Sequence, residues 1–148
     1  MKQSNRDNLS YDIMVVEKKE LTRNTLKRIL ESEGYTVDTA ENGKESIEKL
    51  RSHKYAYGLV ITEIVMPYAG GYEVIETVKE ESTVPVIVLS AITDTRTINE
   101  SFRLHADDFI RKPFDSTALV NRIGSLLEKN KTRPFLPQAQ SAPAQRRA

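Results

Sequence analysis

The sequence predicts an α/β protein of the doubly wound class, in which five parallel strands form a sheet and five helices cover its two faces. Short apolar runs alternate with segments of helical spacing along residues 11–129, and this alternation is typical of parallel strands joined by crossover helices. The run Val84 to Leu89 is rich in branched residues, as expected of a strand that is buried on both faces. A length of 148 residues fits one domain, since domains typically contain about 100 to 200 residues.

The first two strand and helix pairs precede residue 55. The strands are the apolar run 11–17 and the alternating, β-rich stretch 35–40. After each strand the apolar residues recur at helical spacing, which predicts one helix that ends at Gly34 and a second, charged helix after Asn42-Gly43. The apolar positions of these helices are Leu21, Leu26, Ile29 and Leu30 in the first, and Ile47 and Leu50 in the second.

The rest of the domain repeats this pattern three times. Further strands are predicted at residues 59–62, 84–89 and 108–111. The helices that follow them are 72–81, 94–104 with the apolar pair Ile98 and Phe102, and a last helix with the stripe Leu119, Val120, Ile123, Leu126 and Leu127. Five such units form the flavodoxin-like fold, with strand order 2-1-3-4-5.

Composition excludes several classes of function. The chain has no cysteine, which rules out disulfides, thiolate nucleophiles, iron–sulfur clusters and cysteine zinc sites and fits a reducing compartment. Its longest apolar run is far shorter than the 18 or so residues of a membrane span. We therefore expect a soluble, cytoplasmic protein with no membrane partner.

Charge is distributed unevenly along the chain. The last 18 residues carry four of the 22 basic residues and no acid, so residues 1–130 hold 18 basic and 21 acidic residues, a balance of −3. An acidic body argues against direct binding of nucleic acid. We expect a polar N-terminal segment at 1–10, a domain at 11–129, and a basic tail or linker at 130–148, which is rich in Pro, Ala and Gln.

Polar residues close most of the predicted strands. The first strand ends in Glu17, Lys18 and Lys19, and the third, fourth and fifth end in Glu63, Ser90 and Lys112. Ligands of open α/β sheets bind outside the carboxyl ends of the strands. These residues are therefore the candidate site.

An ordered set of motifs at these strand ends resembles a response-regulator receiver domain of the CheY-like superfamily, over residues 11–129. The motifs are Glu63-Ile64-Val65-Met66-Pro67, Gly71, Ser90-Ala91 and Ala106 through Phe114. The resemblance implies two-component signalling, in which an aspartate after strand three accepts a phosphoryl group from a histidine kinase. It further implies that acids after strand one and the backbone of Val65 hold Mg²⁺, that Ser90 and Lys112 contact the phosphoryl oxygens, and that Phe109 and Ser90 form a switch.

The sequence departs from this pattern at the two decisive positions. Glu63 stands where the family has the acceptor aspartate, and Lys18, next to Glu17, stands where it has a Mg²⁺ ligand. We therefore expect a disabled metal site and no cofactor. Lys18 either substitutes for the metal between Glu17 and Glu63 or points into solvent. Glu63 either forms a plain ion pair with Lys112 or partly imitates an acyl phosphate.

The resemblance carries further expectations about local structure. It implies a cis Lys112-Pro113 bond, and we expect positive φ angles at Gly71 and His105. Asp107, Asp108 and Arg122 match charges that pair across a two-fold axis in one receiver subfamily. Because Ala118 replaces an expected acid there, any such homodimer should be weak.

Three functions remain open from the sequence. The first is a pseudo-receiver, not an enzyme, that binds a signalling protein through its last helix and strand without a phosphoryl switch. The second is a working phosphoacceptor that serves a histidine kinase. The third is a fragment of a larger regulator whose output domain follows residue 148.

Overall fold

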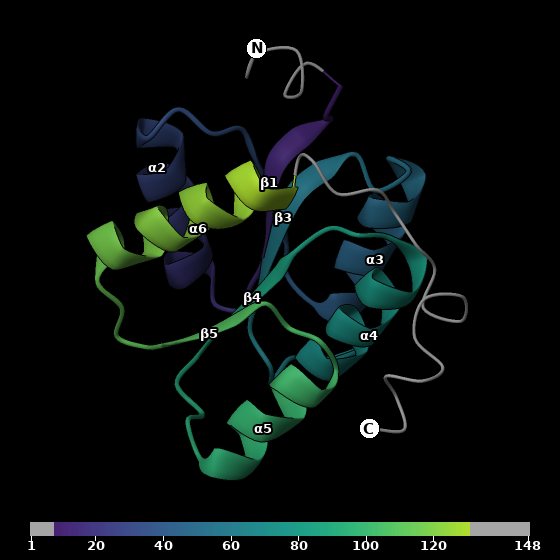
Figure 1. The fold of residues 1–148 in the computed structure, drawn as a ribbon, viewed down its shortest axis with the longest axis vertical. Helices are drawn as coiled ribbons and strands as arrows, with labels where there is room; N and C mark the ends of the chain where they lie inside the picture. Colours follow the sequence, from purple (N-terminus) through teal and green to yellow (C-terminus); the bar gives the residue numbers. More distant parts are fainter. Residues whose placement is uncertain (1–7, 131–148) are drawn as a thin grey trace.

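The computed structural model describes residues 8–130, which fold into a five-stranded parallel sheet flanked by helices (Figure 1). The strand order is β2-β1-β3-β4-β5, with every neighbouring pair parallel. The strands are β1 (Tyr11–Val16), β2 (Val37–Ala40), β3 (Tyr57–Thr62), β4 (Val86–Ser90) and β5 (Asp108–Arg111). The predicted fold class and strand order are confirmed.

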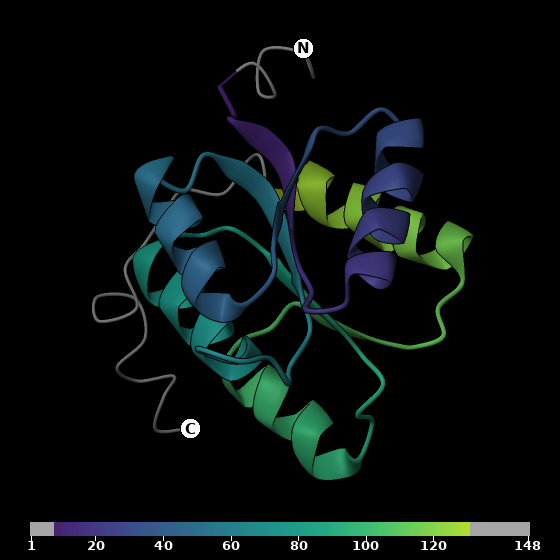
Figure 2. The same ribbon diagram turned by 180° about the vertical axis from the view of Figure 1, so that it is seen from behind.

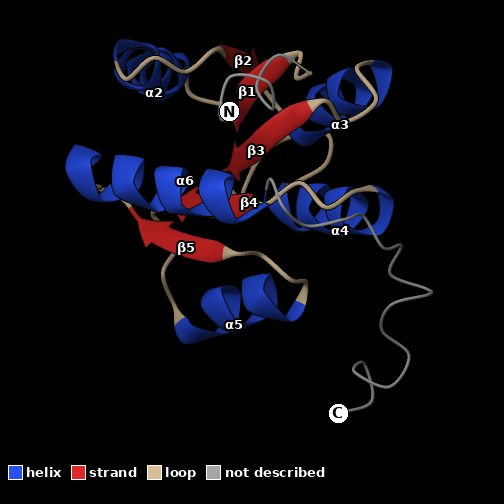
Figure 3. Ribbon diagram, turned by 45° about the horizontal axis from the view of Figure 1, so that its top comes forward, coloured by secondary structure: helices blue, strands red, loops and turns tan. Residues whose placement is uncertain are grey.

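Helices cover both faces of the sheet. They are α2 (Glu20–Ser32), α3 (Gly43–Ser52), α4 (Gly71–Glu81), α5 (Thr95–Arg103) and α6 (Ser116–Asn130). Figure 3 shows α2 and α6 on one side of the strands and α3 and α4 on the other, and Figure 2 shows α3, α4 and α5 from the reverse side. No helix within residues 8–130 is long and apolar enough to cross a lipid bilayer.

The core consists of two apolar clusters, one on each face of the sheet. Alternate residues of a strand point to opposite faces, so Ile13 and Leu59 pack under α2 and α6, while Met14 and Val60 pack under α3 and α4. All six residues of β3 are buried. The central strands are therefore fixed on both faces, and their carboxyl ends form a rigid base for a site.

Two apolar residues that the sequence places on helix faces are exposed in the structure. Leu21 is 80% exposed and Phe102 is 45% exposed. At about 100° per residue, Leu21 lies roughly 140° around α2 from the buried Leu26. On α5 the buried positions are Thr97 and Ser101, each one residue before the predicted apolar pair. The predicted core positions of Leu21 and Phe102 are thus wrong.

The expectation of a positive φ angle at Gly71 is also wrong. Among the described glycines, only Gly34, after α2, has a positive φ, of 95°. Gly71 is required for a different reason, because a Cβ atom there would lie 2.3 Å from the Glu63 carbonyl oxygen. The first turn of α4 therefore packs directly against the backbone of the candidate site.

Two other local expectations are confirmed. His105 has a φ of 80°, so it is a turn residue in the left-handed region before β5. The peptide bond between Lys112 and Pro113 is cis.

Candidate functional site

Three charged residues at the strand ends form one cluster, which we call the three-charge cluster: Glu17, Glu63 and Lys112. The Lys112 Nζ atom lies 2.6 Å from Glu17 Oε1 and 2.9 Å from Glu63 Oε1. The side chains of Glu17, Glu63 and Lys112 are only 3%, 8% and 19% exposed. The predicted ion pair between Glu63 and Lys112 is confirmed, and Glu17 shares the same ammonium.

Backbone hydrogen bonds hold the cluster at the ends of β1, β3 and β5. The Glu17 N–H donates to the Ala40 carbonyl, and the Glu63 N–H donates to the Val16 carbonyl, each over 3.0 Å. The Lys112 N–H donates to the Ser90 carbonyl, also over 3.0 Å. The backbone hydrogen bonding of each of these strands thus continues one residue beyond the strand end, and it places a charged side chain at the same edge of the sheet.

The second oxygen of each carboxylate accepts a backbone N–H. The Lys19 N–H donates to Glu17 Oε2 over 2.9 Å, and the Ile64 N–H donates to Glu63 Oε2 over 2.8 Å. No buried side-chain nitrogen or oxygen in the described part of the chain lacks a hydrogen-bond partner. The cluster is therefore a fully paired arrangement with one excess negative charge.

Electrostatics keep Glu63 and Lys112 ionised. Burial alone would raise the pKa of Glu63, but hydrogen bonds from Lys112, Ser90 and the Ile64 backbone outweigh burial and lower it. Burial would lower the pKa of Lys112, but its hydrogen bonds to Glu17 and Glu63 raise it overall. Both groups therefore stay charged around neutral pH.

Ser90 and Phe109, the predicted switch residues, lie next to this cluster and its core. Ser90 is fully buried; besides its hydrogen bond to Glu63, its Oγ accepts the Ile92 N–H over 3.0 Å. Phe109 is half-buried and packs against the apolar cluster under α3 and α4. Ser90 thus links Glu63 to the loop between β4 and α5.

Lys18 does not occupy the position between Glu17 and Glu63. Its side chain is exposed, and the ammonium that bridges the two carboxylates belongs to Lys112. The hypothesis of Lys18 as a substitute for the metal is therefore wrong, and the solvent alternative is the observed one. An exposed ammonium keeps its hydration, which a buried one would lose.

The cluster does not provide a donor set suited to Mg²⁺. Every carboxylate oxygen of Glu17 and Glu63 already accepts a hydrogen bond. Mg²⁺ requires oxygen ligands in near-ideal octahedral geometry, and Lys18 offers none. Within residues 8–130, no group of three or more His, Cys, Asp or Glu side chains is placed to hold a metal ion.

The three residues predicted for a dimer interface have partners within the same chain. Asp107 Oδ2 accepts from Lys79 Nζ over 2.7 Å and from the Val86 N–H over 2.8 Å. Asp108 pairs with Arg122 of α6. These contacts fasten β5 to α4, β4 and α6, and the homodimer stays a prediction.

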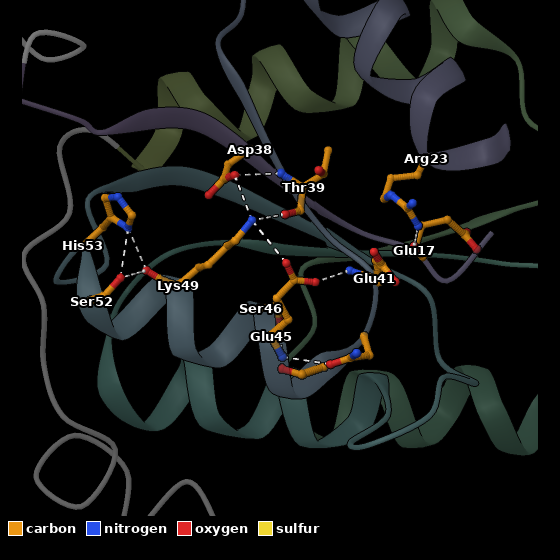
Figure 4. Close-up of polar contacts among 12 residues, drawn as sticks. Glu17, Arg23, Asp38, Thr39, Glu41, Glu45, Ser46, Lys49, Ser52 and His53 are labelled. Carbon is orange, nitrogen blue, oxygen red and sulfur yellow. Dashed lines mark hydrogen bonds and ion pairs between the residues drawn. The ribbon is translucent and has the colours of Figure 1, made fainter. Parts of the chain in front are cut away.

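Sequence reasoning missed a polar network between α3 and β2. Lys49 Nζ donates to the Thr39 carbonyl over 2.7 Å and lies 3.5 Å from Asp38 Oδ1 (Figure 4). The hydroxyl of Tyr57 donates to Asp38 Oδ2 over 2.8 Å. Of this region, only the start of α3 could be predicted from the sequence. The Asn42 side chain accepts the N–H of Glu45, three residues later, which is a recognisable capping pattern.

Arg23 is a second residue that the sequence analysis missed. Its Nη1 donates to the Glu17 carbonyl over 2.8 Å (Figure 4). The same atom lies 3.4 Å from the Lys18 carbonyl. An arginine on a charged helix gives no sequence signal for such a contact, because only the fold shows which carbonyl it reaches.

Comparison with known proteins agrees with this geometry. The sequence model of the response regulator receiver domain matches residues 13–124. The chain is 36% identical over 118 residues to response regulator RR06 of Streptococcus pneumoniae, covering 80% of this chain and 54% of that protein. It is 34% identical over 117 residues to the transcriptional regulatory protein ResD of Bacillus subtilis, covering 79% and 48%.

A solved structure of the signal receiver domain of a histidine kinase from Syntrophus aciditrophicus superposes with a TM-score of 0.76. Its sequence is 31% identical, and the match covers 84% of this chain and 96% of that one. By contrast, the chain spans about half the length of the two curated relatives. The chain belongs to the family of response regulator receiver domains of two-component systems.

Proposed function

We propose that this protein is a pseudo-receiver, a signalling module that acts by protein–protein interaction without a phosphoryl switch. The observation that carries the proposal is the bridge from Lys112 to both Glu17 and Glu63. The cation that would stabilise a transferred phosphoryl group is already neutralised by two buried carboxylates of the same chain.

The chemistry of phosphoryl acceptance explains why this arrangement disfavours it. Transfer relies on an available carboxylate oxygen and on positive charge around the phosphoryl oxygens. Both oxygens of Glu63 are engaged, one by Lys112 and one by the Ile64 N–H. The side chain at position 18 is an ammonium exposed to solvent rather than a metal ligand.

Exposed apolar side chains support a role in binding proteins. Receiver domains interact with histidine kinases and other signalling partners in two-component systems. In this chain Ile92 and Phe102, before and on α5, are 44% and 45% exposed. We place the partner on the side of the molecule formed by α5, β5 and α6, where these residues offer apolar contact area.

Two alternatives rest on specific observations. A working phosphoacceptor is favoured by the contacts of Ser90 and Lys112 with Glu63, because transfer would use both residues. A larger regulator is favoured by the two curated relatives, because the match to this chain covers only 54% and 48% of their length. In that case residues 131–148 would lead to an output domain; this tail lies outside the described residues.

Incubation with a small phosphodonor and Mg²⁺, followed by intact mass measurement, tests the proposal. We expect no gain in mass, because both oxygens of Glu63 accept hydrogen bonds and position 18 carries a lysine instead of an oxygen ligand. A gain of one phosphate that disappears in Glu63→Gln would overturn the pseudo-receiver and establish the phosphoacceptor.

A further inference from the structure

We propose that Arg23 is a positioning residue for the three-charge cluster: its guanidinium holds the turn between β1 and α2 so that Glu17 faces Lys112. The inference rests on the proposed role of the cluster as the site's permanent ion pair. According to this inference, the contact of Arg23 determines whether Glu17 joins the cluster or Lys112 pairs with Glu63 alone.

The geometry places Arg23 behind the turn. Its Nη1 donates to the Glu17 carbonyl over 2.8 Å and lies 3.4 Å from the Lys18 carbonyl, while its own N–H donates to the Lys19 carbonyl over 2.9 Å. The Arg23 side chain thus contacts the carbonyls of Glu17 and Lys18, and its backbone contacts that of Lys19. Arg23 is half-buried, so these contacts are partly shielded from water.

The turn has few other supports. Lys19 is the N-cap residue of α2, and its side chain makes no capping hydrogen bond, although side-chain caps usually fix the entry into a helix. The Glu17 N–H bonds to Ala40, and Glu17 Oε2 accepts the Lys19 N–H from within the same turn. Arg23 is therefore the side chain that secures the turn from outside.

The position of the turn determines where the Glu17 carboxylate and the Lys18 ammonium lie. Fixing the carbonyls of Glu17 and Lys18 directs the Glu17 carboxylate inward and leaves the Lys18 ammonium in solvent. A buried carboxylate is costly unless it is paired, so a released turn would let Glu17 move toward water. Lys112 would then keep only Glu63.

Arginine suits this task better than lysine. Its planar guanidinium presents several N–H donors in a fixed arrangement, whereas a lysine ammonium is a strongly hydrated point charge. Two neighbouring carbonyls within reach of one Nη atom match the arginine geometry. A lysine at position 23 would reach them less well and should restore the arrangement only in part.

The test is a side-chain NMR titration of Lys112 in the full chain. Because the hydrogen bond to Glu17 helps to raise the pKa of Lys112, Arg23→Met should lower that pKa toward the value found in Glu17→Gln. The double variant Arg23→Met/Glu17→Gln should show no further shift, and Arg23→Lys should give an intermediate value. Arg28→Met, at an exposed position of the same helix, is the matched control and should leave the titration unchanged.

A titration of Lys112 in Arg23→Met that equals the wild type would overturn the inference, even if the variant were less stable, since Arg23 would then serve only the fold. If Arg23→Met does not fold, Arg23→Gln takes its place with the same two outcomes. An unchanged titration of Lys112 in Arg23→Met would not affect the outcome of the phosphodonor experiment. Likewise, phosphorylation of the wild type would overturn the pseudo-receiver but would not affect the titration shift expected in Arg23→Met. The two proposals can therefore fail separately.

Discussion

Replacing Lys112 with methionine removes the ammonium that bridges Glu17 and Glu63 while keeping most of the side-chain volume. Both carboxylates are almost fully buried; Glu17 would then retain its hydrogen bond from the Lys19 N–H, and Glu63 would retain those from the Ile64 N–H and Ser90. Breaking a buried ion pair by removing one partner typically costs about 3–5 kcal/mol. Lys112 is 19% exposed, so water can partly replace it, and we expect a loss near the lower end, about 3 kcal/mol.

Protonation limits the free energy lost when the buried Glu63 carboxylate has no ammonium partner. A glutamate without the ammonium can take up a proton, and one pKa unit corresponds to about 1.36 kcal/mol. For a group with an ordinary value of 4.5, neutralisation at about pH 7 costs roughly 3.4 kcal/mol. Protonation of Glu63 alone therefore accounts for a loss of the expected size.

The pH dependence separates charge from packing. In the wild type, the lowered pKa of Glu63 gives stability that is present above the unfolded value and is lost as pH falls through the lower folded value. The raised pKa of Lys112 gives stability that is lost only as pH rises through its folded value. In Lys112→Met the pKa of Glu63 should rise, because the ammonium that lowers it is gone, so the variant gains stability as pH falls from about 7 to about 5.

Urea unfolding at these two pH values measures the effect, with Lys18→Met as control. The control removes an exposed lysine near the same site and should change stability by less than about 0.5 kcal/mol. An unchanged midpoint in Lys112→Met would refute the reasoning. A loss that is the same at both pH values would show that packing, not charge, is responsible.

Three further predictions follow from the same geometry. The double variant Lys18→Asp/Glu63→Asp should bind Mg²⁺, because it supplies the missing oxygen ligand; amide spectra that do not respond to Mg²⁺ would contradict this. Gly71→Ala should cost about 1–3 kcal/mol through the clash with the backbone, whereas Gly124→Ala should stabilise by about 0.5–1 kcal/mol, because its Cβ atom would meet only the Tyr35 hydroxyl at 3.9 Å, an ordinary contact distance; equal urea midpoints would refute the contrast. Any homodimer should be weak and favoured by low salt, since exposed ion pairs contribute about 0–1 kcal/mol each; sedimentation at two ionic strengths tests it, and a dimer unchanged by Arg122→Glu would use another surface.

The sequence was sufficient for the fold because hydrophobic periodicity reports burial directly. The buried strands differ from the predicted ones by at most two residues at either end, as for β4, which runs from Val86 to Ser90 rather than from 84 to 89. Periodicity failed on α5, where Thr97 and Ser101 are buried and Phe102 is exposed. An inward face of small polar residues has no apolar signal.

The sequence predicts which residues form the candidate site, but not which of their charges pair with one another. Charged residues at successive strand ends indicate a common edge, and this argument correctly brought Glu63 and Lys112 together. It did not decide between Lys18 and Lys112 as the cation for Glu17, because lysine side chains are long and the turn after β1 is irregular. The contact of Arg23 with that turn depends on backbone geometry that no sequence pattern encodes.

The cluster also fastens an edge of the sheet to its centre. β5 has only four residues and pairs with β4 alone, as the equally short β2 pairs with β1 alone, so it is one of the two strands most easily lost by local opening. Lys112 follows β5, yet its Nζ contacts residues at the ends of β1 and β3, so its side chain spans the end of β4. In Lys112→Met, amide hydrogen exchange should therefore increase most in β5, relative to β3. A uniform increase would show that the cluster contributes to global stability without holding the edge strand, and the side of the molecule that we assign to partners would then not depend on it.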